Sequence, residues 1–274
     1  EPMQQRNFNF SYMFQYNDIN IYEKGNRAYN TTYKYHLAEF GFSDVWYKNF
    51  RFGLGLRFEY YKYKDFLFKQ PELIDLKVES EHFLSYFAQI HYNTYDKGYF
   101  PAKGSDFKAA YSLYTDNMAQ YNEHAPFSAL SASWASVLPI TRRFSVIPSI
   151  YGRILIGRNF PYPLQNAIGG EVPGFYIPQQ LPFAGVNNIE LMDNAIMIAS
   201  LKLRQRMGAI HYLILTGNYG LTDSHFFKIL KGKQLFGISA GYGMDSVFGP
   251  LEISLGYSNQ TDKASCFVNL GYYF

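Results

Sequence analysis

The pentapeptide Gly237-Ile238-Ser239-Ala240-Gly241 has the G-x-S-x-G spacing with which many serine hydrolases present their nucleophile. That chemistry requires a strand, a strained turn at the serine and a helix whose first turn helps to bind the oxyanion. The residues after Ser239 instead continue as a strand toward a turn near Met244-Asp245-Ser246. The sequence therefore predicts a glycine-rich strand here and no catalytic residue.

Histidine and cysteine, which also carry chemistry in many sites, show no useful spacing. No histidine belongs to an H-E-x-x-H pattern or another metal-binding pattern, and one cysteine offers no thiolate site. The residues concerned are His36, His82, His91, His124, His211, His225 and Cys266. We expect no metal site and no cofactor.

The amino-acid composition is typical of a protein with one face in lipid and another in water. Aromatic residues make up 19% of the 274 residues, while charged residues make up 17%, below the roughly 25% of an ordinary soluble domain. The mean hydropathy of -0.22 is nonetheless slightly polar. These values fit a β-barrel with a lipid face and a wet face, in which girdles of Tyr and Phe account for the aromatic residues. The net charge of +3 is spread along the chain, which argues against nucleic-acid binding.

Alternation with a period of two runs through the chain and predicts an all-β fold. Arg6–Tyr16 and Phe50–Tyr63 show it most clearly, and each is long enough to cross a bilayer as a tilted strand. No apolar run approaches the roughly 18 residues of a membrane-spanning helix. Ten further segments lie near 32–44, 82–93, 107–115, 128–137, 144–156, 195–206, 210–221, 235–243, 251–259 and 264–274. We predict one antiparallel transmembrane β-barrel domain of about twelve strands over residues 1–274.

The connections alternate between short and long, as in barrels with short periplasmic turns and longer extracellular loops. Asn17–Thr31 and Lys64–Glu81 are predicted to be two of the longer loops. The longest connection, from about Gly157 to Asn194, is rich in proline, glycine and aromatic residues. Because such a length is usually functional or disordered, and rigid turn residues favour order, we expect this loop to fold inward as a plug.

The last segment of the chain alternates toward an aromatic terminus. Val268, Leu270, Tyr272 and Phe274 share one face of it, which is typical of the closing strand of an outer-membrane barrel. We expect this strand, 264–274, to pair with Arg6–Tyr16, because closure leaves no unpaired backbone edge in lipid.

Three stretches resemble the BamA-like superfamily, the bacterial surface antigen family. Tyr95–Gly104 resembles its D-x-G-Y-F-P-x-x-G turn, Ile168–Phe175 is similar to its inward-loop motif, and Phe248–Ser254 resembles its penultimate hairpin. The motif positions are Asp96, Gly98, Pro101 and Gly104 in the turn, and Gly169, Gly170, Val172, Pro173, Gly174 and Phe175 in the loop. The resemblance covers about Tyr95 to Phe274. Independently of it, Pro101 and Gly104 suit a tight turn.

This chain departs from the family in two respects. Pro173 stands where the family has an arginine that reaches acidic residues on the wall, so that ion pair cannot form here. Family barrels have sixteen strands and place the turn motif after the eighth, whereas about four strands precede it here. Either the barrel is shortened and closes at about twelve strands, or four strands have been removed or lost.

The segment Gln179–Gly185 is similar to barrels fused to patatin-like phospholipases in Bacteroidetes, a single-chain variety of type V secretion. This resemblance implies a barrel that anchors a passenger and exports it. A general outer-membrane porin and a BamA-like assembly factor stay open as alternatives. Patatin-like enzymes use a Ser-Asp dyad, and no Asp-Gly pair occurs in this chain to supply it, so we expect an enzyme only in an upstream domain.

The same resemblance implies a location and partners. The location would be the bacterial outer membrane, and the partners would be its lipids and lipopolysaccharide, the outer-membrane assembly machinery and a fused passenger. No nucleic-acid partner is expected. Tyr272 and Phe274 would also serve as the last-strand signal that the assembly machinery reads.

Overall fold

The structure, a computed structural model, describes residues 5–47, 49–68, 80–117, 120–122, 125–174 and 176–271. Twelve strands form one antiparallel sheet, in the order of the chain. They are β1 (Gln5–Glu23), β2 (Asn26–Tyr47), β3 (Phe50–Phe68), β4 (Glu81–Asn93), β5 (Gly104–Tyr114), β6 (Phe127–Pro139), β7 (Phe144–Ile156), β11 (Ala195–Met207), β12 (His211–Asp223), β13 (Lys233–Ser246), β14 (Gly249–Ser258) and β15 (Lys263–Leu270). The predicted all-β fold with about twelve strands is therefore confirmed.

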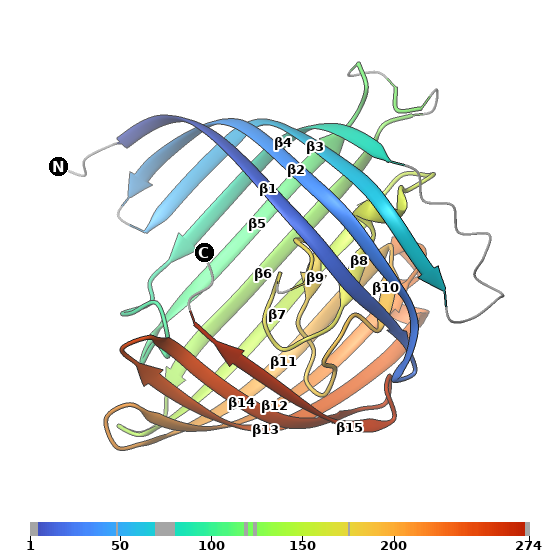
Figure 1. The fold of residues 1–274 in the computed structure, drawn as a ribbon. Coiled ribbons are helices and arrows are strands. Elements are labelled where there is room, and N and C mark those ends of the chain that lie inside the picture. Colours follow the sequence, from blue (N-terminus) through green and yellow to red (C-terminus); the bar gives the residue numbers. More distant parts are fainter. Residues whose placement is uncertain are drawn as a thin grey trace.

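The sheet curls around a second, smaller layer that comes from the connection between β7 and β11 (Figure 1). This connection contains the 3₁₀ turn η2 (Tyr162–Leu164) and a small sheet of β8 (Asn166–Ile168), β9 (Gln180–Leu181) and β10 (Leu191–Asp193). The expectation of an ordered loop that folds inward is met. Among the described residues, no helix is long and apolar enough to cross a membrane.

The first two strands are longer than the sequence predicts. β1 and β2 pair without a loop from Gln5↔Val45 to Glu23↔Asn26, so the predicted loop Asn17–Thr31 is wrong. Only Lys24 and Gly25 turn the chain, and both have positive φ (48° and 72°), as a tight hairpin turn requires. The polar residues that resemble a loop continue the face of β1 that carries the exposed Phe14 and Tyr16, and there the Asn30 amide donates hydrogen bonds to Asp18 and Asn20.

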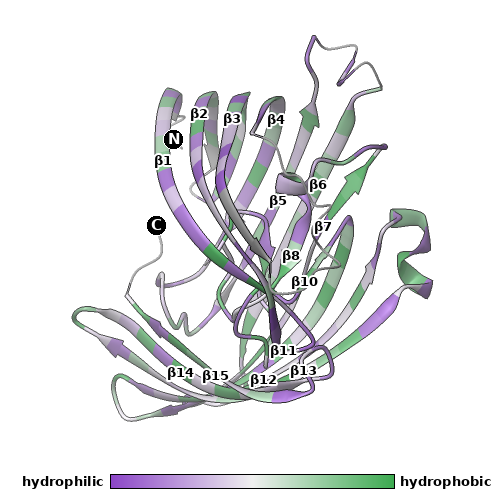
Figure 2. Ribbon diagram, turned by 45° about the vertical axis from the view of Figure 1, so that its right-hand side comes forward, coloured by the Kyte–Doolittle hydropathy of each residue, from purple (hydrophilic) through white to green (hydrophobic). Residues whose placement is uncertain are grey.

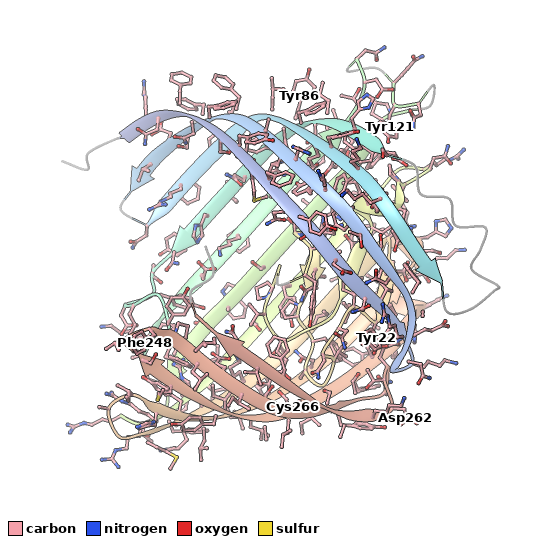
Figure 3. All side chains as sticks on the ribbon, in the orientation of Figure 1. Tyr22, Tyr86, Tyr121, Phe248, Asp262 and Cys266 are labelled. Carbon is pink, nitrogen blue, oxygen red and sulfur yellow. The ribbon has the colours of Figure 1, made fainter. Side chains whose placement is uncertain are left out.

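Hydrophilic and hydrophobic residues alternate along the strands (Figure 2), and the exposure of their side chains distinguishes an outer face from an inner one. Phe8, Phe10 and Tyr12 of β1 are 76%, 74% and 60% exposed, whereas Tyr33 and Tyr35 of β2 are only 4% and 2% exposed. The side chain of Tyr86 on β4 projects outward from the wall (Figure 3). Interfacial girdles thus account for only part of the aromatic content. The rest fills the interior as a tyrosine-rich core beneath β1–β4, joined by the loop residues Leu164, Ala167, Ile177 and Ile189.

The predicted pairing of the first and last strands is wrong for the residues that the structure describes. β1 pairs only with β2, and β15 only with β14, so a seam separates the two edges. Within the described residues, β15 spans 8 residues and β1 spans 19, so the two edges differ in length. At one end, the backbone edge of β1 is already taken by the loop, since the Tyr22 amide donates to the Ile189 carbonyl at 2.8 Å. Tyr272 and Phe274 lie outside the described residues.

Candidate functional site

The turn motif between β4 and β5 is built around Asp96 and Gly104. The Asp96 carboxylate accepts hydrogen bonds from the Ala102 amide at 2.8 Å and the Lys103 amide at 3.4 Å, which closes the turn. Gly104 has φ of 108°, and a Cβ there would lie 2.3 Å from the Thr94 carbonyl oxygen, so only glycine fits. Gly98 has open space around it, and the structure gives no reason for glycine at that position.

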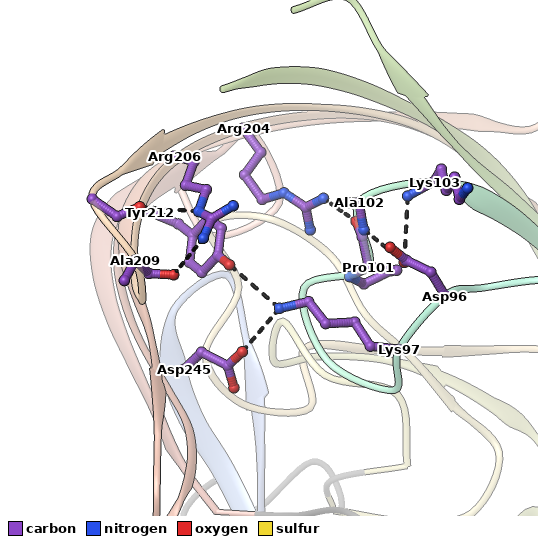
Figure 4. A network of polar contacts seen from close by, with 11 residues as sticks. Asp96, Lys97, Pro101, Ala102, Lys103, Arg204, Arg206, Ala209, Tyr212 and Asp245 are labelled. Atoms are coloured by element: carbon purple, nitrogen blue, oxygen red, sulfur yellow. Dashed lines mark hydrogen bonds and ion pairs between the residues drawn. The ribbon is translucent and has the colours of Figure 1, made fainter. Parts of the chain in front are cut away.

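The same turn reaches across the lumen to the opposite wall (Figure 4). Phe100 is 7% exposed and stacks on Tyr212 of β12, with ring centroids 4.5 Å apart and an interplanar angle of 13°. Phe100 has φ of 46°, a conformation that costs about 1–3 kcal/mol for a residue with a side chain. The Arg204 guanidinium of β11 donates to the Pro101 carbonyl. This turn therefore fixes one end of β4–β5 to β11–β12.

An ion pair completes this contact. Lys97 Nζ lies 2.9 Å from the Asp245 carboxylate and 5.9 Å from the centroid of the Tyr212 ring. Burial lowers the pKa of the Lys97 ammonium, but its hydrogen bonds to Asp245 and Tyr212 outweigh burial, so the pKa lies above its ordinary value. The sequence motif identified the turn but not the residues that it contacts on the opposite wall, Tyr212, Arg204 and Asp245, because contacts across a lumen leave no local signal.

The inward loop is fastened at its base and organised by one glutamine. Asn166 is fully buried and donates to the carbonyls of Arg153 and Asn194, each at 2.8 Å. The Gln180 side chain is 2% exposed, and its amide nitrogen donates to the carbonyls of Gly169 and Val172.

The Gln180 amide oxygen also accepts a hydrogen bond from the Tyr176 amide at 2.8 Å. Gly170 and Gly174 of the loop motif both have positive φ (64° and 69°), which their places in its turns require. Gln180 thus ties the loop motif 169–174 to β9, and Phe175 lies outside the described residues.

Glu171 of the loop motif contacts the wall, whereas Pro173 cannot form the ion pair that the family arginine makes. Pro173 is exposed, while the Glu171 carboxylate accepts from the Ser239 hydroxyl at 3.2 Å and from the Gly185 amide at 3.3 Å. Ser239 is 3% exposed and lies within β13, with no helix after it. The prediction of a glycine-rich strand in place of a hydrolase elbow is confirmed.

One glycine of β13 and one of the loop let the loop approach the wall closely. A Cβ on Gly237 would lie 2.2 Å from the Ala184 carbonyl oxygen, and one on Gly185 would lie 2.3 Å from the Tyr257 backbone. Beside this contact, the loop residues Phe183 and Val186 are at most 1% exposed against Ile198 and Leu235 of the wall. The loop is therefore packed as a core and not merely suspended in the lumen.

The loop segment 187–190 bridges the seam, and we call it the clasp. Asn187 donates to the Cys266 carbonyl of β15 at 2.5 Å, while Ile189 forms the isolated bridge to Ile21 of β1. Glu190 accepts from the Gly25 amide at 3.1 Å. The Glu190 carbonyl accepts from the Gln260 side chain at 3.4 Å. Tyr22 and Asp262 mark this end of the two edges in Figure 3.

The space left in the lumen is lined by both apolar and charged side chains. A cavity of about 850 Å³ lies between the loop and the inner faces of β3–β7, and a second of about 320 Å³ lies beside Glu171 and Ser239. The charged and polar side chains that line these cavities are Arg57, Glu59, Gln89, His91 and Lys108 in the larger, and Lys202 and Arg204 in the smaller. Several form contacts within the wall, such as Arg57 with Glu39 at 2.7 Å and His91 with Asp106 at 2.6 Å.

The contacts of Arg57 with Glu39 and of His91 with Asp106 indicate that polar side chains around the cavities stabilise the wall. Within the described part of the chain, no group of three His, Cys, Asp or Glu side chains could hold a metal ion. His124 lies outside the described residues.

A curled antiparallel sheet with an apolar outer face, filled by its own loop, defines a β-barrel of the outer-membrane type. The model of the OMP85 superfamily matches residues 3–274, and the chain belongs to this superfamily. The superfamily resemblance seen in the sequence is thereby confirmed.

Two solved structures share the fold. BamA from Haemophilus ducreyi lacking POTRA domains 1–3 matches with a TM-score of 0.69 and 12% identity, over 98% of this chain and 59% of that one. CdiB from Escherichia coli matches with a TM-score of 0.61 and 14% identity, over 97% of this chain and 48% of that one. The chain thus spans 48–59% of the length of these two proteins. No curated protein matches the chain in sequence.

Proposed function

We propose that this chain is the membrane-anchoring and translocating β-barrel of an OMP85 secretion protein in the bacterial outer membrane. In the full-length protein it would be joined to a patatin-like passenger, as the segment Gln179–Gly185 suggests. The enzyme activity would then belong to the passenger and not to this chain. The partners would be outer-membrane lipids, the assembly machinery and the passenger itself.

The main support for the proposal is that the inward loop both packs in the lumen and contacts the two unpaired strand edges. The loop fills the lumen through buried residues such as Phe183 and Val186, and its clasp holds the two unpaired edges at one end only. A general porin needs an open, water-filled lumen, which a packed loop obstructs. A wall that is plugged inside and unpaired at one seam is suited to the controlled passage or anchoring of a polypeptide.

The BamA-like assembly role is the second candidate, and the open edge of β1 favours it. An unpaired strand edge can template the pairing of another strand. Pro173, in place of the family arginine, weighs against a mechanism that depends on an ion pair between that arginine and the wall.

The test uses the full-length protein in whole cells. An epitope on the passenger should become accessible to external protease, and exchange of the barrel for a periplasmic lipid anchor should abolish that access. A passenger that stays protected with the intact barrel would contradict export. Loss of other outer-membrane proteins on depletion would favour the assembly role, and lipid hydrolysis by this chain that disappears in Ser239→Ala would favour an enzyme.

A further inference from the structure

The connection between β12 and β13 carries a short element on the outside of the barrel. The 3₁₀ helix η3 (Phe226–Lys231) places Phe226 and Ile229 against the wall. The wall residues beneath it are Ile154, Ala195 and Leu221. Ala195 and the exposed Met197 are two residues apart on β11 and therefore share a face, so this patch belongs to the outer face.

η3 presents apolar and basic side chains away from the protein. Phe227 and Leu230 are 91% and 80% exposed. Lys228 and Lys231 are exposed beside them, and neither forms an ion pair with any residue that the structure describes. The nearest acid in the sequence, Asp223, accepts a hydrogen bond from the backbone of its own turn, the His225 amide, at 2.7 Å. Such a pattern is typical of a segment at a membrane interface.

An apolar groove of about 510 Å³ lies on the outer wall below η3. Its centre is Gly217, which pairs with Leu201 on one side and Ile238 on the other, and a Cβ there would meet nothing within 4 Å. Tyr219 and Phe236 form the end nearest η3, with ring centroids 5.1 Å apart. Tyr219 precedes the end of β12 by four residues, which corresponds to roughly 13 Å along a strand.

We infer that η3 and this groove form a binding site for a phosphorylated, multi-acyl lipid of the outer leaflet, such as lipid A. An acyl chain lies in the groove over Gly217. Phe227 and Leu230 enter the apolar region, and the Lys228 and Lys231 ammonium groups bind a phosphate. η3 lies at the end of the barrel that carries the longer connections, which is the outer side in barrels of this class. The site rests on the proposed outer-membrane location, but not on any passenger.

The experiment measures lipid retention by the folded protein in detergent micelles, with native mass spectrometry. The probes are lipid A, phosphatidylglycerol and phosphatidylcholine. The charge variant is Lys228→Gln/Lys231→Gln, and its conservative partner is Lys228→Arg/Lys231→Arg. The matched control, Lys103→Gln/Arg142→Gln, removes two exposed charges at the other end of the barrel. The groove variant is Gly217→Leu, matched by Ala132→Leu on the outward face shared by Leu130 and Trp134.

Lipid A should bind the wild type, the arginine variant and both controls. The glutamine variant should bind it roughly tenfold or more weakly, and Gly217→Leu should also weaken it. Unchanged retention by the glutamine variant, or equal retention of phosphatidylcholine, would overturn the site. Equal binding of phosphatidylglycerol would overturn the multi-acyl assignment. A passenger that is not exported leaves these results unaffected, so failure of the proposed function is distinguishable.

Discussion

The carboxylate of Glu190 accepts a 3.1 Å hydrogen bond from the backbone amide of Gly25, which joins the inward loop to the turn at the end of the first hairpin. Glu190 is 6% exposed. Burial raises the pKa of its carboxyl above the ordinary value, while the Gly25 amide and the Lys263 ammonium act in the opposite direction. The clasp therefore includes an acid that is more easily protonated in the folded protein than in the unfolded chain.

This shift predicts a pH dependence of stability. Because the folded pKa is raised, the contribution of Glu190 is fully present below the unfolded pKa of about 4.3 and is lost as the pH rises through the folded value. Glu190→Gln keeps an acceptor for Gly25 and cannot ionise. We expect the unfolding temperature of the variant, relative to wild type, to increase from about pH 4 to neutral pH. A constant difference across this range, measured by heat-modifiability gels, would show that Glu190 is not the titrating group.

The turn motif predicts unequal effects for its two contacts with the opposite wall. Phe100→Ala should lower the free energy of unfolding by about 3 kcal/mol, since it removes a buried ring. Lys97→Ala should cost less than about 1 kcal/mol, because the side chains of Lys97 and Asp245 are 41% and 36% exposed. Denaturant titrations of detergent-folded protein measure both values. A larger loss for Lys97→Ala would reverse this ranking.

Two glycines offer a matched test of how the loop packs. Gly237→Ala brings a Cβ against the Ala184 carbonyl and should cost about 1–3 kcal/mol, together with faster proteolysis of 157–194. Gly217→Ala adds the same methyl group where space is open, so stability should be unchanged or slightly higher. Equal effects of the two substitutions would be incompatible with close packing of the loop on β13.

Because the inward loop plugs the lumen, the intact protein should conduct ions poorly, and removal of the loop should raise its conductance. Replacement of residues 171–187 by a short Gly-Ser linker removes Phe183 and Val186 from the interior and should convert a barrel of low conductance into an open pore. Planar bilayer recordings compare the two proteins. High conductance of the wild type would instead favour the porin alternative.

The wall could be predicted from the sequence because alternation is a local signal. In Arg6–Tyr16 the aromatic residues fall on one face, and the structure exposes those same residues. The hairpin at Lys24–Gly25 was not predicted because Asn17, Asp18 and Asn20 resemble a loop in composition, and the hydrogen bonds that Asn30 of β2 donates to Asp18 and Asn20 of β1 are visible only in the structure.

The candidate site was predictable where a short stretch of chain requires particular residue types, as at Asp96 and Pro101 of the turn. Gly104 and the glycines of the loop motif belong to this class. Glu171 with Ser239, Phe100 with Tyr212, and the clasp are contacts between distant segments, which no spacing encodes. The open seam between β1 and β15 was not predicted, for a related reason. Closure satisfies backbone groups in lipid, but the loop competes for the edge of β1.

Disulfide trapping tests the open seam most directly, in a Cys266→Ser background. Cysteines at Ile253 and Val268, which pair across β14 and β15 on the outer face, should cross-link efficiently. Cysteine at Phe14, Tyr16 or Asp18 of β1, each combined with Val268→Cys, should give little disulfide, because β1 pairs only with β2 and β15 only with β14 among the described residues. A β1 position that cross-links to Val268→Cys as well as the Ile253 pair does would show that β1 and β15 close the barrel, and would contradict the seam.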